Sequence, residues 1–266
     1  MTTSAAPLTV ITGASSGIGR ELALIAARRG DALLLIARGS EALERTAGET
    51  RDAGSPHVVA LSADVATIAG VHAVADRARE VAEQSGHVLT TLVNNAGYGS
   101  AGAIAEMDEA VVTNMIELNC RSVALLTRLL LEDVIAARGG VLTVASTAAF
   151  QPGPGMAVYS ASKAFALSFS VALREELRGT GAHATGLCPG PVPTGFQQRA
   201  GMGDMRMAKI AEQPATHVAE AAWRGLAANR AVVVPGAANK LGALGARFSP
   251  IALTARMARL ALGALD

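Results

Sequence analysis

The stretch Leu8-Thr9-Val10-Ile11-Thr12-Gly13-Ala14-Ser15-Ser16-Gly17-Ile18-Gly19 joins a short β-type run to a glycine-rich turn, and a helical pattern follows it. This order is typical of dinucleotide binding, because glycines let backbone N–H groups approach a pyrophosphate and the helix N-terminus favours its negative charge. The Gly-x3-Gly-x-Gly spacing differs from the commoner Gly-x-Gly-x-x-Gly, so a purely structural turn is the alternative. The predicted pyrophosphate contacts are Gly13, Ser15, Ser16, Gly17, Ile18 and Gly19.

Apolar strand-like runs alternate with helical patterns from Leu8 to Val234, and no linker interrupts them. This alternation predicts an α/β fold, namely a Rossmann-type, doubly wound parallel sheet of about seven strands between two layers of helices. We expect residues 1–236 to form the NAD(P)-binding catalytic domain and residues 237–266 to extend it as an amphipathic helical tail. The expected strands cover residues 8–11, 32–37, 58–63, 91–93, 141–145, 183–188 and 231–234.

The composition sets further limits. A chain of 266 residues with 50% hydrophobic and 17% charged residues can build a large core. The net charge of +1 and the aromatic content of 3% give no reason to expect nucleic-acid binding. We find no secretory signal pattern and no apolar run long enough to span a bilayer, so we expect a cytoplasmic protein. The two cysteines, Cys120 and Cys188, are too few for a metal site, and we interpret them as buried thiols rather than catalytic ones.

Two strand ends bear on the choice of cofactor. NAD-binding units usually carry an acidic residue near the end of the second strand, where this chain has Ala37 and Arg38. Because a guanidinium can form paired bonds with a phosphate, we expect NADP(H) to be preferred, with NAD(H) as the second choice. The alternative is that Arg38 is a solvated surface residue. At the end of the third strand, Asp64 is placed to accept a bond from an adenine amine.

Three polar residues follow in the second half of the pattern. Asn95 lies in an Asn-Asn-Ala-Gly turn, where a structural role competes with cofactor contact. Asn119 falls in an apolar helical region between about residues 106 and 138, where a buried, satisfied amide is the alternative to a functional role. Ser146 ends the fifth strand, on the sheet edge where ligands bind in open α/β sheets.

Tyr159 and Lys163 form the strongest candidate for proton transfer. They are four residues apart at the start of a predicted helix, so they share one face and an ammonium can act on a phenol. The chain has 20 arginines but only three lysines and two tyrosines, which makes this pair unusual. An ordinary surface lysine at a solvated helix start is the alternative.

Two segments near the C-terminus are harder to interpret. Residues 195–213 carry Met202, Met205 and Met207, which suits an apolar lid over a substrate or a surface loop without function. From Ala221 to Leu265 there are six basic residues and no acidic one, with apolar residues at helical spacing. Such a segment packs on its own domain, on a second subunit, or on a membrane surface.

With these motifs in order, the chain resembles the short-chain dehydrogenase/reductase family, in its single-domain, NADP-preferring division. The resemblance covers Leu8 to about Val234 and rests on the glycine turn, Asp64, the turn at residues 94–97, Asn119, Ser146, the Tyr159/Lys163 pair, and Pro189-Gly190 with Thr194. The segment after Val234-Pro235-Gly236 is similar to the subgroup called DltE-like.

The resemblance implies a role for each motif. Tyr159 is the general acid/base, with its phenolate favoured by the Lys163 cation and the nicotinamide ring. Lys163 also bonds the nicotinamide ribose, Ser146 holds the substrate oxygen, and Asn119 anchors a water of a proton relay. Thr194 contacts the nicotinamide carboxamide. The cofactor cleft is further lined by Arg38, Asp64, Val65, Asn95, Ala96, Gly97, Pro189, Gly190 and Val192.

The implied activity is NADP(H)-dependent hydride transfer on a small carbonyl or secondary alcohol, by a homodimer or homotetramer. One residue departs from the pattern: many NADP-preferring members have a basic residue where this chain has Ser16. The alternatives are a sensor or scaffold that binds NADP without turnover, and a peripheral-membrane reductase of a lipid-like substrate. An epimerase or dehydratase is disfavoured, because such relatives carry a larger substrate region.

Overall fold

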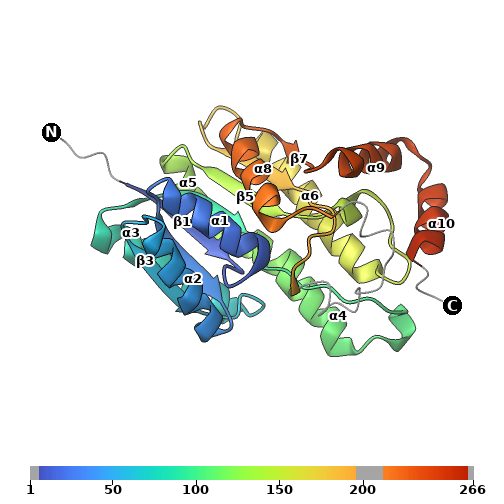
Figure 1. Cartoon of the computed structure of the whole chain (residues 1–266), viewed down its shortest axis with the longest axis horizontal. Helices are drawn as coiled ribbons and strands as arrows, with labels where there is room; N and C mark the ends of the chain where they lie inside the picture. The colour runs from blue at the N-terminus through green and yellow to red at the C-terminus, as the bar shows by residue number, and fades with distance from the viewer. Residues whose placement is uncertain (1–5, 196–211, 263–266) are drawn as a thin grey trace.

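A computed structural model describes residues 6–195 and 212–262, and the side chains of the last two residues are not included. The expected lid methionines at positions 202, 205 and 207 lie outside the described residues. Figure 1 shows a central sheet with helices on both sides. The strands are β1 (Pro7–Thr12), β2 (Ala32–Ala37), β3 (Val58–Ser62), β4 (Val88–Asn94), β5 (Gly140–Val144), β6 (His183–Leu187) and β7 (Val232–Val233).

The helices alternate with these strands, as the sequence pattern predicts. The α-helices are α1 (Gly17–Arg28), α2 (Ser40–Asp52), α3 (Ile68–Ser85), α4 (Glu109–Ile116), α5 (Ser122–Ala136), α6 (Ala157–Glu176), α8 (Ala215–Ala227), α9 (Ala237–Phe248) and α10 (Ile251–Leu262). Short 3₁₀ turns η1 (Ile104–Glu106) and η3 (Thr147–Phe150) and a π-helical turn η2 (Glu117–Arg121) complete the described part.

The sheet is parallel, with the strand order β3-β2-β1-β4-β5-β6-β7, which confirms the predicted doubly wound fold of seven strands. The strand order reverses between β1 and β4, because β1 pairs with both β2 and β4. In open α/β sheets this reversal leaves a crevice at the carboxyl ends of the strands, where ligands bind.

Strand β2 explains why helices cover both faces of the sheet. Its six residues are all buried, and consecutive side chains point to opposite faces. Leu34 and Ile36 belong to the core under α3 and α5, whereas Leu33 and Leu35 belong to the core under α1, α2 and α8. The indole Nε1 of Trp223 donates to the Leu22 carbonyl at 3.1 Å, which fixes α8 against α1. Two cores on one sheet hold the carboxyl edge rigidly in place.

The tail forms two helices rather than one. Leu244, Phe248 and Ile251 have helical spacing in the sequence, but α9 ends at Phe248 and α10 begins at Ile251. Pro250 explains the break, because proline disfavours the helical conformation of the preceding residue and lacks an N–H to donate. Both helices lie at the end of the molecule away from α3 (Figure 1). Within residues 6–195 and 212–262, no helix combines the length and the apolarity needed to cross a bilayer.

Candidate active site

A cavity of about 720 Å³ lies at the carboxyl edge of the sheet, where the strand order reverses. Apart from Gly19 and Asn119, it is lined by every residue that the sequence predicted as catalytic or cofactor-binding. These lining residues are Gly13, Ser15, Ser16, Gly17, Ile18, Arg38, Asp64, Val65, Asn95, Ala96, Gly97, Ser146, Tyr159, Lys163, Pro189, Gly190, Val192 and Thr194.

The glycine turn between β1 and α1 leaves no room for side chains. Gly13 has a φ of +67°, and a Cβ there would lie 2.8 Å from Asn95 Nδ2 and 2.9 Å from Ala96 Cα. A Cβ on Gly19 would lie 2.2 Å from the Gly13 carbonyl oxygen. Gly19 therefore does not line the cavity but lets α1 approach the turn, so that the helix N-terminus lies next to the cavity.

Asn95 ties the end of β4 to the glycine turn. Its Nδ2 donates to the carbonyls of Thr12 at 2.8 Å and Gly13 at 3.0 Å. The Thr12 hydroxyl accepts from the backbone N–H groups of Asn95 and Ala96, each at 3.0 Å. These bonds give Asn95 the structural role that its turn sequence suggests, while its side chain still borders the cavity.

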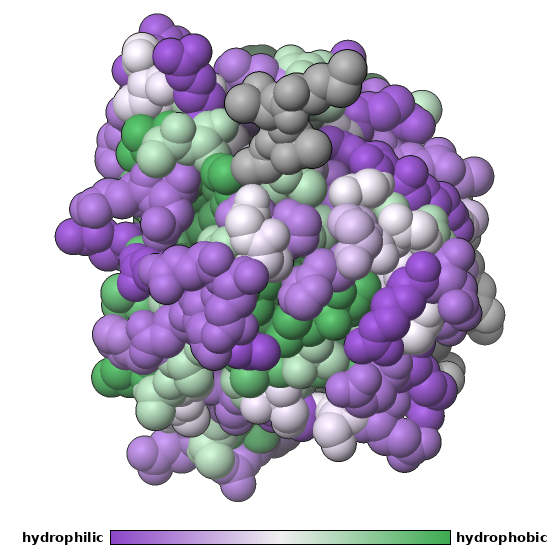
Figure 2. Space-filling view, turned by 90° about the vertical axis from the view of Figure 1, so that its left-hand side faces the viewer, coloured by the Kyte–Doolittle hydropathy of each residue, from purple (hydrophilic) through white to green (hydrophobic). Residues whose placement is uncertain are grey.

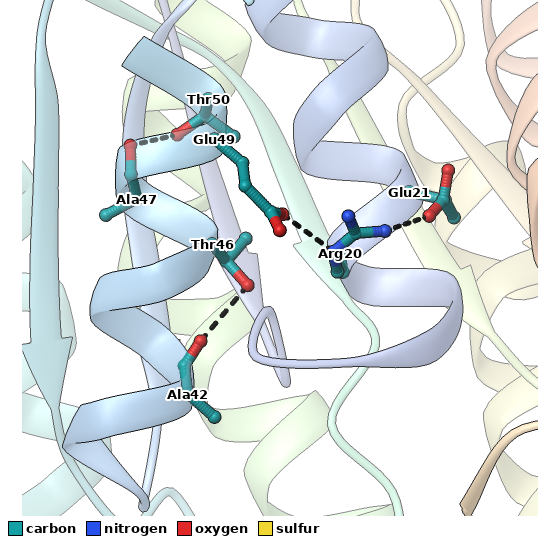
Figure 3. Close-up of polar contacts among 7 residues, drawn as sticks. All are labelled: Arg20, Glu21, Ala42, Thr46, Ala47, Glu49 and Thr50. Carbon is teal, nitrogen blue, oxygen red and sulfur yellow. Dashed lines mark hydrogen bonds and ion pairs between the residues drawn. The ribbon is translucent and has the colours of Figure 1, made fainter. Parts of the chain in front are cut away.

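Arg20, which follows the glycine turn, already forms ion pairs within the protein. Arg20 Nε bonds Glu49 Oε2 on α2 at 2.7 Å, and its Nη1 bonds Glu21 (Figure 3). Both acidic neighbours raise the Arg20 pKa, with the Glu49 hydrogen bond as the main cause. Arg38, in contrast, is exposed, borders the cavity, and makes no ion pair with any residue of the described part. Arg38 is therefore the guanidinium available to a ligand in this cavity.

Asp64 borders the same end of the cavity as Arg38. Its Oδ1 accepts from the Ala66 N–H at 3.0 Å, and its backbone carbonyl accepts from the Thr67 hydroxyl at 2.9 Å. The Thr67 hydroxyl in turn caps α3 by accepting from the Gly70 N–H at 2.9 Å. The turn after β3 thus holds the carboxylate in one orientation beside the cavity.

Tyr159 and Ser146 meet at the other end of the cavity. Helix α6 begins two residues before Tyr159, and β5 delivers Ser146 at its carboxyl end. The two side chains are hydrogen-bonded to each other, and the Ser146 Oγ also accepts from the Ala148 N–H at 3.1 Å. Tyr159 is 8% exposed, and burial raises the pKa of its phenol, while the hydrogen bond with Ser146 lowers this pKa by less. The lowering that we expected from the Lys163 cation is not among the causes of this shift, which burial dominates.

Lys163 lies one helical turn beyond Tyr159, with its Nζ 6.0 Å from the centre of the tyrosine ring. The side chain is 5% exposed, and its Nζ donates to the Val144 carbonyl at 2.9 Å. No carboxylate in the described part forms an ion pair with it. Burial lowers the Lys163 pKa from 10.5 to about 8, and Cys120 and Cys188 partly oppose this. A buried cation without an acidic partner is costly, which makes it a candidate functional group.

Asn119 is buried behind the cavity wall in the π-helical turn η2. Its Oδ1 accepts from the Tyr98 N–H at 2.9 Å, and its Nδ2 donates to the Tyr98 carbonyl at 2.7 Å and the Ser162 hydroxyl at 2.9 Å. These contacts match the satisfied buried amide that its position suggests. They also connect α6 to the chain after β4, so Asn119 positions the wall on which Tyr159 and Lys163 lie. π-turns of this kind are frequent at functional sites.

The residue motifs did not identify the apolar wall beside Tyr159. Tyr98, Leu118, Ala148 and Met156 line the cavity, and Met156 packs with Tyr159 and Met115 in a small separate core. The available signals were the position of Tyr98 directly after Gly97 and the turn-rich loop that ends at Met156. None of these side chains is charged. The cavity thus combines a polar, charged end at Arg38 with an apolar end at Tyr159.

Comparisons with known proteins agree with this geometry. The short chain dehydrogenase family model matches residues 7–204. The chain is 33% identical over 227 residues to 11-beta-hydroxysteroid dehydrogenase A of Sesamum indicum. The aligned stretch covers 82% of this chain and 64% of that protein. It spans 53% of each of two 11-beta-hydroxysteroid dehydrogenases of Arabidopsis thaliana, so it covers less than two thirds of these relatives.

Solved structures match over most of both chains. A short-chain dehydrogenase from Sphingobium yanoikuyae in complex with NADPH has a TM-score of 0.79 and 32% identity, covering 91% of this chain and 93% of the other. A short-chain dehydrogenase/reductase from Burkholderia phymatum in complex with NAD has a TM-score of 0.81 and 28% identity, covering 92% and 94%. On the family model, the sequence identity and the shared fold, the chain belongs to the short-chain dehydrogenase family of oxidoreductases.

Proposed function

We propose that this protein is an NADP(H)-dependent oxidoreductase that interconverts a carbonyl compound and a secondary alcohol, with Tyr159 as the general acid/base. The observation that carries this proposal is the hydrogen bond between Ser146 and Tyr159 at the cavity wall, with the Lys163 ammonium one helical turn away. The hydroxyls of Ser146 and Tyr159, which are hydrogen-bonded to each other, form a polar site on an otherwise apolar wall. A carbonyl oxygen is a ligand that fits this site.

The cavity residues fit a nicotinamide dinucleotide. The glycine turn and the start of α1 form a cradle for a pyrophosphate, since side chains at Gly13 and Gly17 would approach Ala96 and Thr194. Asp64 would hold the adenine, Arg38 the ribose phosphate, and Lys163 the nicotinamide ribose. A bound nicotinamide supplies the hydride. Both the NADPH and the NAD complexes of related structures support this class of cofactor, and Arg38 favours the phosphorylated form.

The chain's own groups would then handle the substrate oxygen and its proton. Ser146 would donate a hydrogen bond to the oxygen and fix its position next to Tyr159. During reduction the Tyr159 hydroxyl would donate the proton, and during oxidation its phenolate would accept one. Burial keeps the Tyr159 pKa above its ordinary value, so the protonated phenol that donates in the reduction step is present at neutral pH.

The cavity wall also indicates the class of substrate. Tyr98, Leu118, Ala148 and Met156 surround the Ser146/Tyr159 pair, and Lys163 is the charged side chain that the described residues place at this end. Apart from the lysine that the ribose would occupy, residues 6–195 and 212–262 offer no cation here to a substrate carboxylate or phosphate, which would lose its hydration. We therefore expect a mainly apolar ketone or aldehyde to be preferred over small charged carbonyl compounds.

The function is tested by mixing the purified chain with NADPH and a panel of carbonyl compounds and following the loss of NADPH absorbance. We expect turnover of apolar ketones, aldehydes or quinones, and weaker turnover of charged ones such as keto acids. Tight NADPH binding by calorimetry without turnover of any compound would contradict the oxidoreductase function and favour the non-catalytic sensor.

Arg38 provides the test of cofactor choice. We expect Arg38→Ala to raise the KM for NADPH by about 10- to 100-fold, because a hydrogen bond to a charged group contributes roughly 1.5–3 kcal/mol. The KM for NADH should change little, since NADH has no phosphate at that position. The matched control is Arg45→Ala on α2, whose partner is Glu41 on the same helix. Equal losses for NADPH and NADH would remove the argument for NADP(H).

A further inference from the structure

The two tail helices expose large apolar side chains that nothing in the described part covers. Of the twelve large hydrophobic residues exposed among the described residues, seven lie between positions 241 and 260. The exposed fraction reaches 79% for Phe248 and 86% for Leu260. We call this surface the tail face; it consists of Leu241, Leu244, Phe248, Ile251, Leu253, Met257 and Leu260.

The orientation of the helices shows that the exposure is built into the fold. In each helix the buried positions carry small side chains, Asn239 and Ala243 in α9 and Thr254 and Ala258 in α10. Leu241, Leu244 and Phe248 are spaced by three and four residues, so they form one ridge on the opposite side of α9. A helix that packed only on its own domain would point its large apolar side chains inward.

Helix α9 is attached to the domain through its small face. Asn239 is 7% exposed, its Nδ2 donates to the Pro235 carbonyl at 3.0 Å, and its side chain lies so close to Gly190 that a Cβ there would be 2.3 Å from Asn239 Oδ1. The helix also contacts η3, the turn that follows Ser146. The α9 part of the tail face therefore has a fixed position relative to the cavity.

The charged residues of the two tail helices all have the same sign. Lys240, Arg247, Arg256 and Arg259 are all exposed, and no acidic residue occurs between Ala221 and Leu265. In α9 the two basic residues are seven apart and lie on one flank of the apolar ridge. The opposite end of the molecule differs, because hydrophilic side chains cover most of it (Figure 2). Apolar side chains bordered by lysine and arginine are typical of helices that lie in the interface of an anionic bilayer.

We infer that the tail face binds the surface of a membrane that contains anionic lipids, with the apolar ridge in the headgroup region and the basic residues at the lipid phosphates. The basic residues beside the tail face favour a membrane over a second copy of the chain as its partner. In a symmetric dimer through the tail face, the same surface would face itself. Its basic residues would then meet other basic residues with no acidic partner on the same helices, which is destabilising.

The test is co-sedimentation of the full chain with vesicles. We expect the protein to sediment with vesicles of equal parts phosphatidylglycerol and phosphatidylcholine, to remain in solution with pure phosphatidylcholine, and to dissociate as salt rises. Leu244→Ser with Phe248→Ser removes part of the ridge, and Lys240→Gln with Arg247→Gln removes half of the basic residues. We expect each pair to weaken binding at least tenfold, since a lipid-facing basic residue contributes about 1 kcal/mol and a buried large apolar side chain about 1.5–3 kcal/mol.

Matched controls come from other helices. Ile68→Ser removes an exposed apolar residue of α3, and Arg45→Gln with Arg128→Gln removes the same charge from α2 and α5. We expect these variants to bind vesicles as the unchanged protein does, and circular dichroism checks that all variants fold. Absence of binding to anionic vesicles by the unchanged protein, or binding by both tail pairs as strong as that of the unchanged protein, overturns the inference. A shift from oligomer to monomer in the tail pairs, without vesicle binding, assigns the tail face to a second copy instead.

Discussion

Replacing Tyr159 with phenylalanine is expected to lower the turnover number for carbonyl reduction by about 10²- to 10⁴-fold, the range that a positioned general acid contributes. The change removes one oxygen and keeps the ring, so the packing of Tyr159 with Met115 and Met156 should survive. The cradle for the pyrophosphate lies at the other end of the cavity. We therefore expect an unchanged dissociation constant for NADPH and an unchanged unfolding temperature, measured by calorimetry and thermal scanning.

The only other tyrosine provides a matched control. Tyr98 borders the same cavity, and its contacts with Asn119 use its backbone rather than its hydroxyl. Tyr98→Phe removes an identical group a short distance away, and we expect it to keep turnover within about tenfold of the unchanged enzyme. Similar losses in the two variants would mean that general polarity of the cavity, and not proton donation by Tyr159, supports the reaction. Full activity of Tyr159→Phe would exclude the mechanism.

The fold could be predicted from the sequence because its signals are local and repeated. Each strand is a short apolar run that ends at a polar residue, a glycine or a proline, and helical patterns alternate with these runs. The run from Ala32 to Ala37 has no polar residue, which is the signature of a strand buried on both faces. The two layers follow from this, since a strand without a polar side needs helices on both.

The site was predictable only where its residues come from strand ends or one helical face. Strand β5 ends beside the start of α6, which brings Ser146 close to Tyr159 and Lys163. The π-turn that turns Asn119 toward Tyr98 and Ser162 depends on tertiary hydrogen bonds that no local pattern encodes. The loop that ends at Met156 was expected to shape the substrate pocket, but the other members of the apolar wall were missed because they share no sequence pattern.

The tail shows a different limit of sequence reasoning. An amphipathic pattern gives two faces but does not say which one the domain covers. The usual assumption places the large apolar residues inward, whereas here Asn239 and Ala243 face the domain. Gly190 explains this choice, because its missing side chain leaves a recess that Asn239 fills. Such a fit depends on two residues that are 49 positions apart and cannot be seen in either segment alone.

Lys163→Arg is expected to reduce turnover by at least about 10²-fold while the chain still folds and binds NADPH with reduced affinity. Lysine is a compact charge that fits between the Val144 carbonyl, at 2.9 Å from its Nζ, and Gly97, where even a Cβ would lie 3.1 Å away. A planar guanidinium is larger and its N–H donors have fixed directions, so it cannot fit between the Val144 carbonyl and Gly97 as the ammonium does. Measurements of turnover and of NADPH affinity by calorimetry separate the two effects.

The same variant tests the lysine through pH. Because the Lys163 pKa is lowered to about 8, about nine tenths of its ammonium is present at pH 7, and it is lost as the pH rises through that value. NADPH affinity of the unchanged protein should therefore fall above pH 8 and be roughly tenfold weaker at pH 9 than at pH 7. An arginine stays protonated throughout this range, so the affinity of Lys163→Arg should be lower but independent of pH. A break near pH 8 that persists in Lys163→Arg would assign the titration to another group and would remove the lysine from cofactor binding.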